Sequence, residues 1–245
     1  MGNAFTEALL ASDLPIIMEV KRQDADGGPI MGERTIPEVV SQYLAVGAPC
    51  ISVVTGKWFG GTESMLTEVA ELTDLPLLRK DFITRDKQIL KSKEMGASAI
   101  LLTARILPKS AFQSLIDRTL SHGLVPFVEI ADHDELDSVI HPEDCIIAIN
   151  NKDIRTQERE AGDIDLSRSL LEAVIDTGTP CPVSASAILD PKVAAELVTA
   201  GFRGLLIGTG LLRAESVQGF VDEFERHRAE LREAVARPSA APGAS

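Results

Sequence analysis

The sequence predicts an α/β fold, a single (β/α)8 TIM barrel in which eight parallel strands form one closed sheet. Three observations predict it. The chain has 245 residues, and one such barrel takes about 250 residues. Eight short apolar segments alternate with amphipathic segments, as in parallel strands joined by crossover helices. The first apolar segment ends in Glu19-Val20-Lys21, whereas an open doubly wound sheet usually has a glycine-rich turn there.

The expected strands are rich in valine, isoleucine and leucine, which is typical of strands buried on both faces. They span residues 16–21, 50–55, 76–80, 98–103, 124–130, 145–150, 181–184 and 203–208. The expected helices span residues 37–46, 63–72, 86–95, 108–122, 132–140, 167–177, 191–200 and 216–236. Gly47, Gly96, Gly123 and Gly201 follow four of these helices, at the position where a left-handed residue closes the last turn.

The two ends of the chain lie outside this alternation. Residues 5–10 form one short helical pattern, which we expect to cover the floor or the mouth of the barrel. Residues 234–245 are mostly alanine, proline, serine and glycine, a composition typical of disordered termini. We therefore expect a barrel over residues 1–233 and a disordered tail over residues 234–245.

The overall charge limits the classes of partner. Lys and Arg total 24 against 37 for Asp and Glu, which gives a net charge of −13. We expect no nucleic-acid partner, because phosphate backbones require a basic face, whereas a small anionic ligand needs only a local positive pocket. We see no signal-peptide pattern and no run near the ~20 apolar residues of a membrane span. The expectation is a cytoplasmic protein without a membrane partner, either a monomer or a homodimer.

The cysteines and histidines give no sign of a metal site. Cys50, Cys145 and Cys181 each begin an expected strand. An odd number without C-x-x-C spacing fits neither a disulfide framework nor a zinc site, so we interpret these residues as small buried apolar groups. The four histidines lie on expected helices or at their ends, and we assign none of them a catalytic role.

Polar residues stand at the C-terminal ends of several expected strands, which is the end of a barrel that carries the active site. Glu19 and Lys21 are two residues apart on the first strand and therefore share a face. Lys80, Glu129 and Asn150 end the third, fifth and sixth strands. Two lysines and two glutamates at one place are costly unless they pair. We interpret them as a candidate catalytic cluster, and a purely structural cluster of ion pairs is the alternative.

Two further features belong to the expected mouth. Residues 208–210 read Gly-Thr-Gly after the eighth strand, where barrels often bind a phosphate through backbone N–H groups. A plain strand–helix turn is the alternative. Trp58 and Phe59 follow the second strand and Phe82 follows Lys80. Aromatic residues there could hold a flat ring, although packing within the loop explains Trp58 equally well.

The sequence resembles the indole-3-glycerol phosphate synthase family from about residue 5 to residue 224. The matching segments are EVKR (19–22), ISVVTGKWFGG (51–61), LPLLRKDFI (75–83), VEIADHDEL (128–136), INNKDIRT (149–156) and IGTGLLRAES (207–216). LRKDFI is highly specific to the family. The resemblance implies a carbon–carbon lyase of tryptophan biosynthesis that closes the indole ring of a 1-(2-carboxyphenylamino)-1-deoxyribulose 5-phosphate. The reaction releases carbon dioxide and water and uses no metal or organic cofactor.

The resemblance also implies roles for individual residues. Lys80 would be the general acid that protonates the substrate carbonyl. Lys21 would hold the aromatic carboxylate or the developing oxyanion, with Glu19 orienting it. Glu129 would transfer protons during dehydration, and Asn150 would hydrogen-bond the reacting hydroxyl or carboxylate. The implied substrate-binding residues are Phe59 and Phe82 at the aromatic ring, Gly208 and Thr209 at the phosphate, and Ser186.

The chain departs from the family pattern at two places. After the seventh strand the family usually reads Ser-Glu-Ser-Gly, whereas residues 184–187 read Ser-Ala-Ser-Ala. Ala185 thus replaces a catalytic glutamate and Ala187 a glycine near the phosphate. Asp24 and Asp26 stand where the family places hydroxyl groups near the ligand. Two alternatives therefore stay open. One is a divergent paralogue that catalyses a related cyclisation or lyase reaction on a different carbonyl substrate in specialised metabolism. The other is a non-catalytic barrel that acts as a binding protein.

Overall fold

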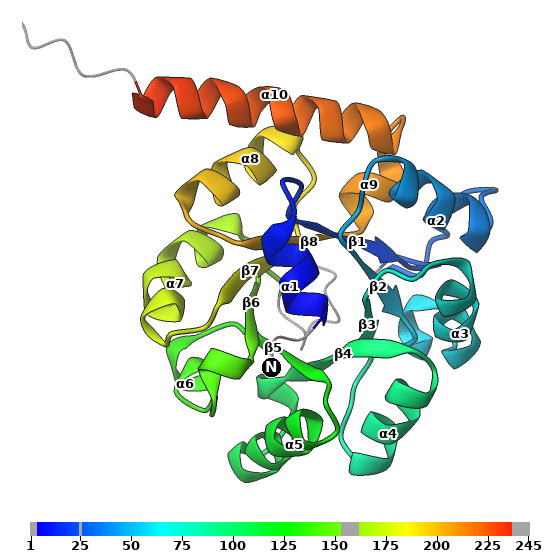
Figure 1. The fold of residues 1–245 in the computed structure, drawn as a ribbon, viewed down its shortest axis with the longest axis vertical. Helices are drawn as coiled ribbons and strands as arrows, with labels where there is room; N and C mark the ends of the chain where they lie inside the picture. Colours follow the sequence, from blue (N-terminus) through cyan, green and yellow to red (C-terminus); the bar gives the residue numbers. More distant parts are fainter. Residues whose placement is uncertain (1–3, 25, 153–161, 237–245) are drawn as a thin grey trace, which may run out of the picture.

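The computed structural model describes residues 4–24, 26–152 and 162–236. Within these residues eight parallel strands close into one barrel, and helices surround it (Figure 1). Each strand pairs with the next strand along the chain, and β8 returns to β1. The predicted (β/α)8 TIM barrel is therefore confirmed.

The strands and helices follow the expected order. The strands are β1 (Ile16–Val20), β2 (Cys50–Val54), β3 (Leu77–Lys80), β4 (Ala97–Thr103), β5 (Val125–Ile130), β6 (Ile146–Asn150), β7 (Cys181–Ala185) and β8 (Gly204–Ile207). The helices are α1 (Ala4–Ala11), α2 (Ile36–Ala45), α3 (Glu63–Leu72), α4 (Asp86–Glu94), α5 (Lys109–Ser121), α6 (His133–Leu136), α7 (Ile164–Asp176), α8 (Pro191–Ala200), α9 (Thr209–Arg213) and α10 (Val217–Ala236). Short 3-10 turns are η1 (Lys57–Phe59), η2 (Ala104–Ile106) and η3 (Pro142–Asp144).

Helix α6 is shorter than the expected helix of residues 132–140. Asp132 caps its start by accepting a hydrogen bond from the backbone N–H of Glu135. The hydroxyl of Ser138 donates to the carbonyl of Glu135 at 2.5 Å, and such local side-chain bonds compete with the helical ladder. The helix therefore ends at Leu136, and η3 leads from there to β6.

Helix α10 extends through Ala236, so residues 234–236 of the expected tail are helical. The rest of that tail, residues 237–245, lies outside the described residues. Within the described part of the chain, no helix combines the length and the apolar character that crossing a membrane requires.

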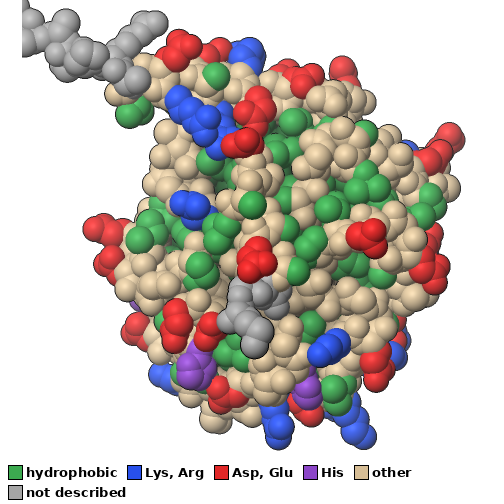
Figure 2. Space-filling model, in the orientation of Figure 1, with side chains coloured by type: hydrophobic (Ala, Val, Ile, Leu, Met, Phe, Trp, Pro, Cys, Tyr) green, Lys and Arg blue, Asp and Glu red, His purple; other side chains and the backbone are tan. Residues whose placement is uncertain are grey.

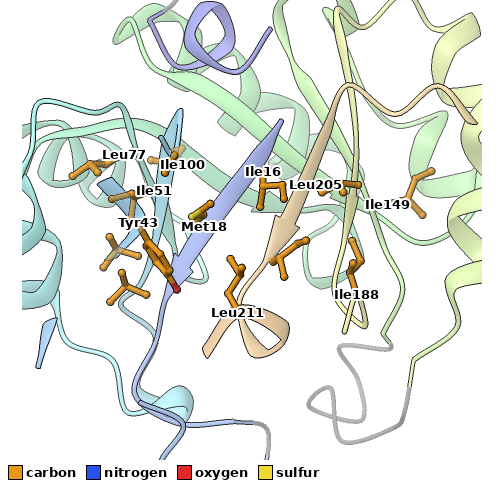
Figure 3. Packing of buried hydrophobic residues seen from close by; sticks show 14 of the residues in the cluster. Ile16, Met18, Tyr43, Ile51, Leu77, Ile100, Ile149, Ile188, Leu205 and Leu211 are labelled. Carbon is orange, nitrogen blue, oxygen red and sulfur yellow. The ribbon is translucent and has the colours of Figure 1, made fainter. Parts of the chain in front are cut away.

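Two layers of apolar side chains meet at the strands. One layer lies between the strands and the helices, and it includes Ile16 and Met18 of β1 and Leu205 of β8 (Figure 3). The other layer fills the barrel, and it includes Ile17 of β1 together with Phe5 of α1. Helix α1 crosses the N-terminal end of the strands (Figure 1), so it forms the floor of the barrel and leaves the opposite end open.

The three cysteines are free and buried, which agrees with their interpretation as small apolar residues. Cys50 and Cys181 belong to the layer inside the barrel and Cys145 to the layer beneath the helices. Burial raises the pKa of the Cys145 and Cys181 thiols to about 12, so both remain protonated at neutral pH.

We expect Phe5→Ala to lower the free energy of unfolding by about 3–5 kcal/mol, the usual cost of emptying a buried aromatic site. Phe5 is 0 % exposed and packs inside the barrel. Urea unfolding followed by circular dichroism measures the change. Glu7→Ala is the matched control, because Glu7 lies on the exposed side of α1, and its effect should stay within about 0.5 kcal/mol. Equal effects of the two substitutions would show that α1 does not seal the floor.

Candidate active site

The alternation of side chains along each strand decides which residues enter the barrel. Ile17, Leu78 and Phe127 belong to the layer inside the barrel. Glu19, Lys80 and Glu129 follow two residues later on the same strands and therefore face the same way. The same reasoning places Asn150 inward, because Ala148 belongs to the inner layer. The predicted catalytic residues thus share the inner face at the C-terminal ends of the strands.

Glu19 is the centre of this cluster. Its Oε1 lies 3.1 Å from the Nζ of Lys21, and its Oε2 lies 3.2 Å from the Nζ of Lys80. The Glu19 side chain is 2 % exposed, and the lysine side chains are 11 % and 12 % exposed. The buried carboxylate of Glu19 is therefore shared by two ammonium groups. Both ammonium groups lie near the mouth of the barrel.

The pairing sets the charge state of Glu19. Burial opposes its ionisation, but the positive charges of Lys80 and Lys21 outweigh burial and lower the pKa of Glu19 from 4.5 to about 2. The hydroxyl of Tyr43 donates to the backbone carbonyl of Glu19 at 2.8 Å from the helix side. Burial and the charge of Glu19 raise the pKa of Tyr43, so this phenol is a neutral donor. Glu19 is therefore held on both faces of β1. The lysines pair with its carboxylate on the inner face, and Tyr43 bonds its backbone carbonyl on the helix side.

Gly208 must be a glycine because it packs directly against Glu19. A Cβ atom at position 208 would lie 2.3 Å from Oε1 of Glu19, far inside contact distance. Gly208 and Thr209 line a small cavity at the mouth that is also lined by Lys21 and Lys80. The predicted residues of the eighth strand end are therefore next to the lysine pair.

Lys152 also lines this cavity, and the sequence reasoning missed it. It belongs to the segment INNKDIRT and follows the inward-facing Asn150 by two residues. Its place directly after the expected sixth strand, at the C-terminal end of the barrel, was the available signal. Residues 153–156 of the same segment lie outside the described residues. The cavity thus has a third ammonium group besides those of Lys21 and Lys80.

The loop after β7 is fixed by Asn151, another residue that the sequence reasoning did not single out. Its Nδ2 lies 3.0 Å from the carbonyl of Ala185 and 3.1 Å from the carbonyl of Ser186. It also lies 3.0 Å from the hydroxyl of Ser184. The Ser184 hydroxyl faces the helix layer and lies 2.7 Å from the hydroxyl of Ser167 on α7. Ser186 lines the cavity, so this anchor positions the predicted substrate-binding serine.

Two consecutive residues of this loop have left-handed backbone conformations. Ser186 has φ of 67° and Ala187 has φ of 59°. A left-handed conformation costs a residue with a Cβ roughly 1–2 kcal/mol, and glycine avoids this cost. The backbone at position 187 therefore has the conformation that suits the glycine of the family pattern, although the chain has alanine there. Ala185 is fully buried in the inner layer.

Arg79 stabilises the strand end that carries Lys80. It points outward and is 2 % exposed. Its guanidinium donates to Thr55 at 3.0 Å and to Asp81 at 2.9 Å. It also donates to Ser92 of α4 and Glu63 of α3 at 3.1 and 3.2 Å. These bonds hold the backbone on both sides of Lys80.

The aromatic residues form the wall on the β2–β3 side of the mouth. The rings of Trp58 and Phe82 have centroids 4.3 Å apart at an angle of 32°. Trp58 is 48 % exposed, so its contact with Phe82 agrees with packing within the loops. The Nζ of Lys21 lies 5.9 Å from the centroid of the Phe59 ring, so Phe59 and the lysine pair border the same space.

Asp24 does not line the cavity, although it stands where the family places hydroxyl groups near the ligand. Its Oδ1 accepts hydrogen bonds from the backbone N–H groups of Asp26 and Gly28 at 3.1 and 2.9 Å. Its Oδ2 pairs with Arg213 of α9 at 2.6 Å. Burial opposes ionisation of Asp24, but these bonds and the charge of Arg213 lower its pKa. Asp26 is exposed. The Asp24 carboxylate therefore stabilises the turn of residues 24–28 and links this turn to α9 through Arg213.

No group of three or more His, Cys, Asp or Glu side chains arranged to hold a metal ion occurs among the described residues.

We expect Glu19→Gln to lower the free energy of unfolding near neutral pH by about 3 kcal/mol, because it leaves two ammonium ions without their shared counter-charge. The pKa of Glu19 is lower in the folded protein, so its contribution to stability is complete above pH 4.5. That contribution is lost as the pH falls from 4.5 to about 2. The difference between wild type and variant should therefore shrink over this range. Urea unfolding at a series of pH values tests this.

Glu33→Gln provides the control for Glu19→Gln, because Glu33 is exposed and forms no ion pair with the described residues. Its effect should be small at every pH. A difference between wild type and Glu19→Gln that stays constant from neutral pH to pH 3 would contradict the assigned pairing.

Comparison with known proteins shows the family of this chain. The family model described as indole-3-glycerol phosphate synthase matches residues 2–224. The indole-3-glycerol phosphate synthase of Bacteroides thetaiotaomicron is 36% identical over 236 residues, which cover 91% of this chain and 86% of that protein. The protein of the same name from Pyrococcus furiosus is 36% identical over 214 residues, or 86% and 91% of the two chains. The one from Aquifex aeolicus is 36% identical over 213 residues, or 86% and 81%. The chain belongs to the indole-3-glycerol phosphate synthase family.

Proposed function

We propose that this chain catalyses the decarboxylating and dehydrating ring closure of 1-(2-carboxyphenylamino)-1-deoxyribulose 5-phosphate to indole-3-glycerol phosphate, as a carbon–carbon lyase of tryptophan biosynthesis in the cytoplasm. One observation carries the proposal. In a chain of this family, Lys21 and Lys80 are held at the barrel mouth by the buried carboxylate of Glu19. Two ammonium groups at the barrel mouth suit an anionic substrate with a reacting carbonyl, and this supports the proposal.

We assign Lys80 the role of the general acid. Ring closure develops negative charge on the substrate carbonyl oxygen, and a positioned ammonium group stabilises that charge and transfers a proton to it. Glu19 and the Arg79 network fix Lys80 from the two faces of the sheet. Such pre-organisation lowers the cost of reaching the reactive geometry.

We assign Lys21 the binding of the aromatic carboxylate of the substrate. Its ammonium group lies between Glu19 and the ring of Phe59. An aromatic acid in this space could pair its carboxylate with Lys21 while its ring packs on Phe59 or Phe82. Glu129 and Asn150 face the same interior from β5 and β6, and we assign them the proton transfers and hydrogen bonds of the dehydration step.

The phosphate of the substrate would bind at the turn formed by Gly208 and Thr209. Ser186 and Lys152 line the same cavity, so a hydroxyl and an ammonium group border the proposed phosphate position. Binding energy at this remote group stabilises the complex and orients the reacting end. The small phosphorylated substrate is accordingly the partner that we propose.

Ala185 favours a second candidate function. It faces the barrel interior beside Asn150 and places a methyl group where the family has a catalytic glutamate. The second candidate is a related cyclisation or lyase reaction on a different carbonyl substrate, which would still use Lys80. The remaining alternative is a non-catalytic barrel that acts as a binding protein. It would convert no substrate in a reaction that depends on Lys80.

Lys80→Met should lower kcat/KM for the carboxyphenylamino substrate by about 100-fold or more, because it removes the proposed general acid. The appearance of indole fluorescence measures turnover. Lys192→Met is the control, because Lys192 is exposed on α8, and it should leave turnover unchanged. Turnover by Lys80→Met at the wild-type rate would exclude the proposed role, whereas its loss in both variants would indicate a general defect.

Ala185→Glu distinguishes the two candidate functions. If the family reaction is the native one, a carboxylate beside Asn150 should raise kcat for the carboxyphenylamino substrate by about tenfold or more. Ala185→Gln has a similar shape without the charge and should give no such gain. If wild type and both variants leave this substrate unchanged while wild type converts another carbonyl compound with Lys80, the second candidate is correct. Urea unfolding checks that each variant is folded.

A further inference from the structure

A second cavity lies at the opposite end of the molecule from the lysine pair. It has a volume of about 680 Å³ and lies between α1, α8 and α10. Its apolar wall includes Leu10 and Phe202, and its polar wall includes Arg203, Arg228 and Arg232. Ligand cavities of small molecules usually measure about 300–1,000 Å³ and combine an apolar wall with a few polar groups.

The concentration of arginine here is unexpected for a chain with a net charge of −13. Figure 2 shows basic side chains beneath the C-terminal half of α10 with acidic side chains beside them, and the charged residues that line the cavity itself are all arginines. Neither Arg203 nor Arg232 forms an ion pair with the described residues, although the chain has 37 acidic residues. The cavity is therefore a local positive site on an acidic molecule, and such a site attracts small anions.

Arg228 is held in place before any ligand binds. Its Nη1 donates to the backbone carbonyl of Asp13 and lies 3.5 Å from a carboxylate oxygen of Glu225. Its guanidinium lies 5.8 Å from the centroid of the Phe224 ring, and the side chain is 11 % exposed. The described residues offer no acceptor to its Nε or Nη2. These two nitrogens form the edge of a guanidinium that binds a carboxylate through two parallel hydrogen bonds.

We propose that this cavity binds a small amphipathic monoanion, a carboxylate attached to an apolar body. The carboxylate would pair with Arg228 and with one of the rim arginines, Arg203 or Arg232, while the apolar body packs on Leu10 and Phe202. Asp13 and Glu225 lie beside Arg228, and the negative charge of Glu225 favours a single charge on the ligand over a double one. The ligand would link α1, α8 and α10 and is distinct from the substrate at the mouth.

Isothermal titration of the full chain with octanoate tests the proposal. We expect one site with Kd below about 1 mM. Octanol has the apolar body without the charge and acetate has the charge without the body, so each should bind at least about tenfold more weakly. Absence of saturable octanoate binding would overturn the proposal. Equal binding of octanoate and acetate would also overturn it, because the apolar wall would then contribute nothing.

Variants locate the octanoate site. Arg203→Gln combined with Arg232→Gln should weaken binding by about tenfold or more, and both side chains are exposed, so folding should be preserved. Arg118→Gln combined with Arg226→Gln removes the same charge from exposed positions outside the cavity and should leave Kd within about twofold. Lys80→Met should bind octanoate like the wild type. Loss of binding in Lys80→Met, or unchanged binding in the first double variant, would place octanoate elsewhere and refute the proposed site.

Discussion

The candidate site depends on one interaction, the buried carboxylate of Glu19 between the ammonium groups of Lys21 and Lys80. Without Glu19, the ammonium groups of Lys21 and Lys80 would repel each other. Without the two lysines, burial of the Glu19 carboxylate would cost free energy, because the carboxylate would lose its hydration with no charge to replace it. The pairing keeps the carboxyl group of Glu19 ionised although its side chain is only 2 % exposed. Both ammonium groups lie at the end of the barrel where an anionic ligand would enter.

The surrounding residues are arranged around this carboxylate. Gly208 provides space for it, because any larger residue would collide with Oε1. Tyr43 fixes the backbone of Glu19 from the helix side, and Arg79 fixes the strand end next to Lys80. Tyr43 and Arg79 thus hold the strands of the mouth from the side of the helices, whereas Gly208 lies at the mouth itself. This division between exposed donors and buried supports is common where catalytic geometry must be held rigidly.

The sequence predicts the barrel well, because buried parallel strands and amphipathic helices have different periods and the chain repeats both eight times. It also places Glu19 and Lys21 on one face of the first strand, since alternation along a strand needs no tertiary information. It could not reveal that Asp24 pairs with Arg213, because these residues are distant in the chain and meet only when β1 and β8 become neighbours. Asn151 was missed because its contacts are to the backbone of another loop, and a sequence pattern carries no trace of such contacts.

The contact between Gly208 and Glu19 has a consequence for the order in which the molecule matures. Glu19 is on the first strand and Gly208 follows the last, and the seam between them joins Ile16 with Leu205. A nascent chain on the ribosome exposes the lysine pair and its carboxylate long before the eighth strand emerges. Until then one wall of the cavity is missing, and the sheet is open with β1 and β7 as its edge strands. The cavity at the mouth can therefore form only when the last strand completes the barrel, late in synthesis. A chain truncated before β8 would have Glu19, Lys21 and Lys80 but not the wall of the cavity that Gly208 provides.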